Sequence, residues 1–187
     1  MKTALAILRG INVSGQKRVP MNELKHLFGE LNCQQVKTYI QSGNVVFTHS
    51  ATDEEQLARQ IEQKIVETFG FQVPVLTRSL SELADIVAQN PFLQEDHTDI
   101  DKLHVTFLSD APDALKRDKI KELAVGADRF ALSGKEIYVY CPNGYGNTKL
   151  SNTFFENKLK VTATTRNWKT VHELLKMMQS LNPNTER

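Results

Sequence analysis

The residues best suited to chemistry lie in a short polar segment close to the amino terminus. Residues 8–21 read LRGINVSGQKRVPM and place Arg9 and Lys17 at the two ends of a stretch that glycines interrupt. Backbone N–H groups in a loop between a strand and a helix are suited to holding a phosphate or carboxylate. The segment therefore suggests an anion site made of Arg9, Gly10, Asn12 and Lys17. A plain connecting loop with solvated charges explains the same residues equally well.

The segment matches a nucleotide-binding P-loop only in part. The motif G-x-x-x-x-G-K-[ST] places a lysine directly after the second glycine, followed by a hydroxyl that binds magnesium. Here Lys17 comes one residue late after Gly15, and Arg18 replaces the hydroxyl. A P-loop also belongs to a parallel sheet, and the hairpins predicted below argue against one. The sequence therefore does not predict an ATP-binding P-loop.

A second polar motif, Gln41-Ser42-Gly43-Asn44, follows in the first half of the chain. One interpretation is a tight turn in which Gly43 supplies a positive φ angle and Asn44 tolerates the bend. The other is that Gln41, Ser42 and Asn44 offer hydrogen bonds to a polar ligand beside the first loop.

A third polar motif lies near the carboxyl terminus and contains Arg166, Asn167 and Trp168. Asn167 is a good helix N-cap, and Trp168 would then pack in the core. Alternatively, Arg166 and the helix N-terminus bind an anion. Lys149 could join a site of this kind from the same half of the chain.

Other chemistry is poorly represented in the sequence. Its five histidines form no HxH or HxxxH pair and its two cysteines form no CxxC pair, so we expect neither a metal site nor a cofactor. The three polar motifs contain no carboxylate or histidine, so a general base would have to arrive from elsewhere in the fold. Tyr138 and Tyr140 alternate on a predicted strand, but no second aromatic set completes an RNA-stacking platform.

Composition places the chain among soluble globular proteins. Its 187 residues are 40% hydrophobic and 24% charged, with a formal net charge of +1. Near-neutral charge disfavours nucleic acid as a partner without excluding it, and the short apolar runs predict no membrane span. Two isolated cysteines fit a reducing cytoplasm. The sequence sets no oligomeric state.

Hydrophobic periodicity predicts the same element order twice. In the first half we expect strands at 3–9, 35–40, 44–48 and 71–77 and helices at 21–31, 52–69 and 79–89. In the second half we expect strands at 102–108, 129–132, 136–141 and 161–164 and helices at 112–124, 150–159 and 168–179. Thr52 with Glu55, and Ser79 with Glu82, are typical of helix-capping boxes.

The two halves also match residue by residue. Residues 73–87 match 161–175 without a gap, and the turn Ser42-Gly43-Asn44 aligns with Ser133-Gly134-Lys135. Each half then reads βαββαβ followed by a helix. This order predicts an α+β protein made of two ferredoxin-like halves with antiparallel sheets. The expected divisions are a first half at 1–90, an acidic link at 91–101, a second half at 102–180 and a flexible tail at 181–187.

Four stretches carry a resemblance to a known family: 8–13, 19–21, 38–47 and 163–168. Together they resemble the uncharacterised bacterial domain-of-unknown-function family 1697. The resemblance extends to about Gln179 and implies a cytoplasmic, two-lobed α+β protein with no activity, cofactor or catalytic residue to transfer. The shared motif positions are more polar than core packing requires, which favours a site; they are Arg9, Asn12, Gln41, Ser42, Asn44, Arg166, Asn167 and Trp168.

Three functions remain open at this point. The first is a binding module for a small phosphate- or carboxylate-bearing ligand, with the three polar motifs forming one basic pocket. The second is an enzyme acting on a phosphorylated or nucleotide-like substrate. The third is an RNA-binding or protein-interaction module.

Overall fold

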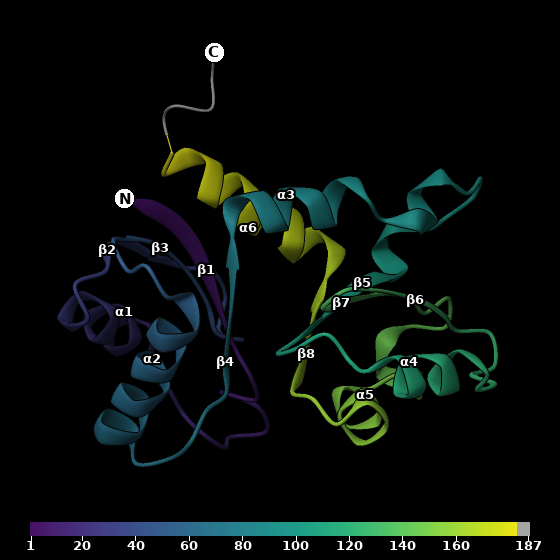
Figure 1. Cartoon of the computed structure of the whole chain (residues 1–187), viewed down its shortest axis with the longest axis horizontal. Coiled ribbons are helices and arrows are strands. Elements are labelled where there is room, and N and C mark those ends of the chain that lie inside the picture. Colours follow the sequence, from purple (N-terminus) through teal and green to yellow (C-terminus); the bar gives the residue numbers. More distant parts are fainter. Residues whose placement is uncertain (183–187) are drawn as a thin grey trace. The chain divides into compact units, whose positions relative to one another are not determined.

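The computed structural model describes residues 1–182 and shows the same order of strands and helices in each half of the chain (Figure 1). The first half contains β1 (Lys2–Leu8), α1 (Met21–Glu30), β2 (Gln34–Thr38), β3 (Asn44–His49), α2 (Glu54–Phe69), β4 (Val75–Ser79) and α3 (Leu80–Ala88). The second half contains β5 (Leu103–Leu108), α4 (Ala114–Lys121), β6 (Arg129–Ser133), β7 (Glu136–Tyr140), α5 (Asn152–Leu159), β8 (Ala163–Asn167) and α6 (Trp168–Ser180).

Each half forms one antiparallel sheet of four strands. The strand orders are β2-β3-β1-β4 and β6-β7-β5-β8, with every neighbouring pair antiparallel. The predicted α+β class, with two similar βαββαβ halves, is therefore confirmed. In each sheet the first strand of the half lies between the hairpin strand and the last strand, so its carboxyl-terminal end lies beside the hairpin turn and the segment that leads into the last strand.

The chain divides into two compact units. One comprises Met1–Asp85 with the described residues from Glu173 onward, and the other comprises Ile86–His172. The divisions fall inside α3 and α6. In the second unit, the segment predicted as an acidic link contains two short 3-10 turns, Pro91–Gln94 and Ile100–Lys102.

The predicted tail at 181–187 lies mostly outside the described residues. Its first two residues are described, and their N–H groups continue the end of α6 by donating to Met178 and Gln179 carbonyls at 3.2 and 3.0 Å. Leu181 is also buried.

The core of the first unit forms where the apolar face of its sheet meets α1 and α2. Leu24, Leu27 and Phe28 of α1, and Leu57, Ile61 and Ile65 of α2, are buried there at the helical spacing seen in the sequence. Figure 1 shows both helices on one side of this sheet. Since each helix presents only one apolar stripe, this packing fixes which face of β1 points away from the helices.

The two predicted helix caps have different outcomes. The box of Ser79 and Glu82 is confirmed, because the Ser79 N–H donates to Glu82 Oε2 at 2.7 Å and the Glu82 N–H donates to Ser79 Oγ at 3.2 Å. The box of Thr52 and Glu55 is wrong. Asp53 caps α2 instead, its Oδ1 accepting the Gln56 N–H at 3.0 Å, because a carboxylate one residue later meets the same orphan donors.

Strand register confirms one part of the internal alignment and corrects another. Arg78 lies opposite Leu5 and Arg166 lies opposite Val105, so the gapless match of 73–87 with 161–175 holds in space. Two residues further along β1 and β5, the pairing partners differ. Ile7 of β1 pairs with Asn44, whereas Phe107 of β5 pairs with Glu136.

The structural equivalent of Asn44 is therefore Glu136, and aligning Asn44 with Lys135 was wrong by one residue. The cause is the different length of the two hairpin connections. The first runs through residues 39–43, whereas the second contains only Gly134 and Lys135. Matching the loop glycines misaligns the strands that follow them.

Candidate functional site

The loop between β1 and α1 has an unusual backbone. Positive φ angles, between 46° and 74°, occur at Gly10, Asn12, Ser14, Gly15 and Lys17. This left-handed conformation is costly for residues other than glycine, although asparagine tolerates it best. The surrounding structure must therefore hold the loop in place.

Asn12 supplies much of that support. Its Nδ2 donates to the Gln41 carbonyl at 2.8 Å and to the Val19 carbonyl at 3.1 Å, while its Oδ1 accepts the Val19 N–H at 2.9 Å. The backbone N–H of Asn12 donates to the Lys17 carbonyl at 3.1 Å. The side chain closes the loop on itself and joins it to the hairpin turn, so the structure brings the first two polar motifs together.

The loop also contacts the segment that leads into β4. Lys17 Nζ donates to the Gln72 carbonyl at 2.7 Å, and the Arg9 N–H donates to the Pro74 carbonyl at 2.9 Å. Arg9 and Gly10 are half-buried, whereas Lys17 and Arg18 are exposed. These exposed cations belong to an opening stretch, residues 1–22, that contains no acidic side chain.

The hairpin turn follows the structural interpretation of its sequence. Asn44 is fully buried, and its Nδ2 donates to the Tyr39 carbonyl and to Ser42 Oγ, both at 3.0 Å. Gly43 has a φ of 88°, and an added Cβ would lie 2.8 Å from atoms of Leu8 and Ile11. Asn44 therefore shapes the turn from within. Gln41 is exposed and Ser42 is half-buried.

The third motif belongs to the second unit, and its side chains also make local contacts. Arg166 is buried, and its Nη1 donates to Thr164 Oγ1 at 2.8 Å and to the Thr165 carbonyl at 2.9 Å. Asn167 Oδ1 accepts the Thr170 N–H at 2.8 Å, and Trp168 is buried. The helix-start interpretation is therefore confirmed.

Lys149 is exposed in the second unit, outside this cluster of contacts. Convergence of the third motif and Lys149 with the first two motifs stays a prediction.

The duplication includes two buried arginines. Only one of them, Arg166, was a candidate site residue from the sequence. Arg78, in the equivalent position of β4, is 2% exposed, and its Nη1 donates to the Thr77 carbonyl at 2.8 Å. A charged side chain is rarely buried to this extent. In the sequence, the signal for these buried arginines was the repeated Thr-Arg pair before a helix cap. The pair marks a structural position that both halves share.

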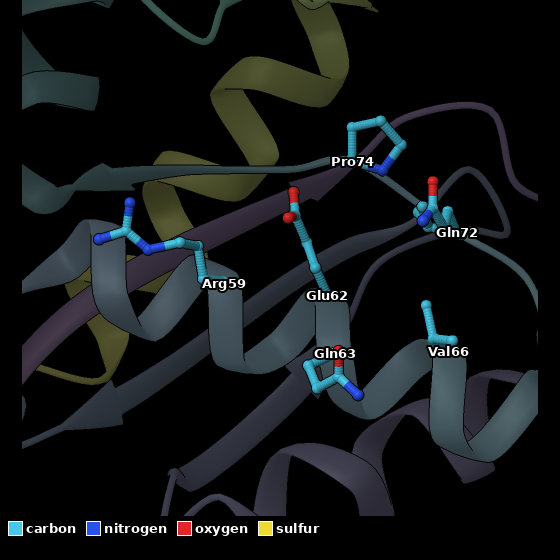
Figure 2. Close-up of a pocket in the computed structure, with 7 residues that line it drawn as sticks. Arg59, Glu62, Gln63, Val66, Gln72 and Pro74 are labelled. Atoms are coloured by element: carbon cyan, nitrogen blue, oxygen red, sulfur yellow. The ribbon is translucent and has the colours of Figure 1, made fainter.

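A pocket of about 270 Å³ lies beside the segment that holds the loop (Figure 2). It is lined by Arg59, Glu62, Gln63, Val66, Gln72, Val73 and Pro74. Figure 2 shows the Glu62 carboxylate rising from α2 toward the segment of Pro74, while the Arg59 guanidinium points away from Gln72. No sequence motif indicated this pocket, because its residues from α2 look like an ordinary helix face and residues 72–74 fall in a predicted strand.

Glu62 has a structural partner that repeats in the second unit. Its Oε1 accepts the Val75 N–H at 2.8 Å, and Glu156 Oε1 accepts the equivalent Ala163 N–H at 3.1 Å. A carboxylate that accepts the first N–H of the last strand in both halves is explained by fold alone.

Across residues 1–182, no group of three or more histidine, cysteine, aspartate or glutamate side chains is arranged to hold a metal ion. Within the same range, no helix is both long and apolar enough to cross a membrane.

The fold and these contacts define a duplicated α+β protein with a buttressed, basic loop at the start of its first sheet. The chain belongs to the family described as protein of unknown function DUF1697, whose model matches residues 1–138. Among solved structures, it is similar to a conserved bacterial protein from Streptococcus pneumoniae, with a TM-score of 0.74 and 23% sequence identity over 95% of this chain and 98% of that one. This likeness shows a shared fold. No curated protein matches the chain significantly.

Proposed function

We propose that this protein is a binding module for a small phosphate- or carboxylate-bearing ligand, held by the loop between β1 and α1. One observation carries the proposal. Within residues 1–182, the backbone N–H groups of Ser14, Gly15 and Lys17 have no hydrogen-bond partner, although they lie in a loop of repeated left-handed conformation. Successive N–H groups in a turn conformation form anion-binding concavities, and those of Ser14 and Gly15 are successive.

The charges around the loop support the same class of ligand. Lys17 and Arg18 are exposed beside those N–H groups, and Arg9 lies half-buried at the start of the loop. Long-range attraction to an anion and short hydrogen bonds from backbone would act together.

The polar side chains take different roles in this proposal. Asn12 and Asn44 position the loop and the turn, because their amides are engaged within the unit. Gln41 and Ser42 form the adjoining wall. Arg166, Asn167, Trp168 and Lys149 remain proposed contributors from the second unit.

The enzyme hypothesis receives less support from the same region. Glu62 is a carboxylate beside the segment that holds the loop, but its contact with Val75 is repeated by Glu156 and Ala163. A residue whose role is duplicated in the other half is explained without catalysis.

Isothermal titration calorimetry with inorganic phosphate, citrate and nucleoside mono- and diphosphates tests the proposal. We expect at least one compound to bind more tightly than about 1 mM, and Lys17→Gln to weaken it roughly tenfold. Lys25→Gln removes the same charge from an exposed position of α1 and should leave binding unchanged. Absence of any submillimolar binding, or unchanged binding in Arg9→Ala together with Lys17→Gln, would contradict the proposal.

A further inference from the structure

The strand β6 is an open edge of the second sheet. Among the described residues it pairs only with β7, in continuous register from Arg129 opposite Tyr140 to Ser133 opposite Glu136. Within residues 1–182, the backbone of β6 makes no hydrogen bond to any element besides β7. A straight edge of this kind is a template for another strand.

The hairpin geometry identifies which backbone groups point outward. Only Gly134 and Lys135 connect β6 to β7, so Ser133 and Glu136 form the hydrogen-bonded pair that closes a two-residue hairpin. Since hydrogen-bonded and non-hydrogen-bonded pairs alternate, the N–H and C=O groups of Leu132 and Phe130 point away from β7.

The duplicated edge strand β2 provides an internal comparison. Lys37 lies opposite Val46, and Ala131 lies opposite Tyr138, two residues beyond the equivalent positions Asn44 and Glu136. Lys37 therefore occupies in β2 the place that Ala131 occupies in β6. The register of β2 also shifts between Gln34 and Lys37, and Gln35 has a φ of 52°. A bulge and a lysine are the devices that keep edge strands from pairing, and β6 has neither at these positions.

We propose that β6 is an interface through which two copies of this chain associate, by antiparallel pairing about Ala131. In this register Phe130 faces Leu132 of the second copy, and the two residues exchange the backbone hydrogen bonds that β7 leaves unused. Both side chains are half-buried and pack against the core of the second unit. Pairing would extend that core across the two-fold axis.

In the same register, no two like charges lie opposite each other. On the other face of the strand, Arg129 meets Ser133 of the second copy, so the two arginines lie at opposite ends of the paired segment. Arg129 already pairs within its own chain with Glu95, at 2.7 and 3.1 Å. Ala131 meets Ala131 at the axis, where a small side chain lets the strands approach.

Sedimentation velocity on the full chain, combined with hydrogen exchange of individual amides, tests the interface. We expect a concentration-dependent dimer, with the amides of Phe130 and Leu132 becoming protected as the dimer forms. Ala131→Lys transfers the lysine of β2 and places two like charges at the axis, so it should weaken association at least tenfold. Asn157→Lys adds the same charge to an exposed position of α5 and should not.

Three results would overturn the proposal. A chain that stays monomeric at all concentrations has no such interface. A dimer that survives Ala131→Lys in correctly folded protein uses another surface. Protection that appears on dimer formation at Lys37 rather than at Leu132 would place the contact on β2.

Discussion

The side-chain amide of Asn12 donates to the backbone carbonyl of Gln41 at 2.8 Å and so ties the loop after β1 to the turn before β3. These two segments are distant in sequence but adjoin neighbouring ends of the paired strands β1 and β3, since Ile7 lies opposite Asn44. The contact gives the first two polar motifs a common structural role, and it makes the loop conformation depend on one side chain.

Asn12→Ala should therefore destabilise the first unit. The substitution removes three side-chain hydrogen bonds and places alanine at a φ of 54°. We expect the free energy of unfolding to fall by about 2–3 kcal/mol in urea titration. Asn22→Ala, at an exposed position of α1, is the matched control and should change it by less than about 0.5 kcal/mol. An equal effect of the two variants would show that Asn12 does not support the loop.

The two hairpin glycines should respond differently to alanine. At Gly43 a Cβ would lie 2.8 Å from Leu8 and Ile11 atoms and φ is 88°, whereas at Gly134 the nearest atom lies 4.0 Å away and φ is 58°. We expect Gly43→Ala to cost about 3 kcal/mol of unfolding free energy and Gly134→Ala about 1 kcal/mol. Chemical denaturation measures both, and equal losses would argue against crowding at Gly43.

Glu62 and Glu156 should behave alike because each accepts the N–H at the start of the last strand of its half. Replacement by glutamine keeps an acceptor oxygen but removes the charge that strengthens the bond. We expect Glu62→Gln and Glu156→Gln each to lose about 1 kcal/mol of unfolding free energy. Glu55→Gln breaks only an exposed pair with Arg59 and serves as the control. A large loss at one glutamate alone would indicate that the two roles differ.

Stability should decline in mild acid because of His49. Its side chain is 2% exposed and, within the described residues, neither ring nitrogen has a hydrogen-bond partner. Burial lowers the pKa of His49 below the ordinary value of 6.5, with Glu54 opposing that shift and Lys2 and the amino terminus adding to it.

The unfolded chain thus takes up a proton near pH 6.5 that the folded chain resists, so the free energy of unfolding falls as the pH drops below that value. Urea midpoints measured from about pH 8 to about pH 5 should show this slope, and His49→Phe should make it shallower. An unchanged slope in His49→Phe would exclude this histidine as the source.

Both cysteines should resist modification in the folded protein. Cys33 and Cys141 are 5% and 0% exposed, and burial raises the pKa of Cys33 to about 11 and raises that of Cys141. The reactive thiolate is therefore scarce and inaccessible at neutral pH. A thiol reagent should label them only after unfolding, while Val13→Cys, at an exposed position, should react at once. Rapid native labelling of wild-type protein would contradict the buried placement.

Local patterns in the sequence determined the order of the elements and their repetition, although β4 (Val75–Ser79) and β8 (Ala163–Asn167) begin and end later than the predicted strands at 71–77 and 161–164. Leu57, Ile61 and Ile65 recur at helical spacing and do form the buried face of α2. The equivalence of Arg78 and Arg166 could also be inferred from the sequence, because the two segments that contain them align without an insertion. Helical periodicity and capping depend on neighbours within a few residues, so the sequence alone contains this information.

Tertiary structure alone decided what the polar residues do. Asn12 and Asn44 looked like ligand contacts, but their amides meet backbone carbonyls that only strand pairing brings near. Because the two hairpin connections differ in length, the sequence did not show that Asn44 is equivalent to Glu136. The open edge of β6 became evident only from the strand pairing. Side-chain hydrogen bonds and strand edges depend on which distant segments become neighbours. The sequence pattern of a single element does not carry that information.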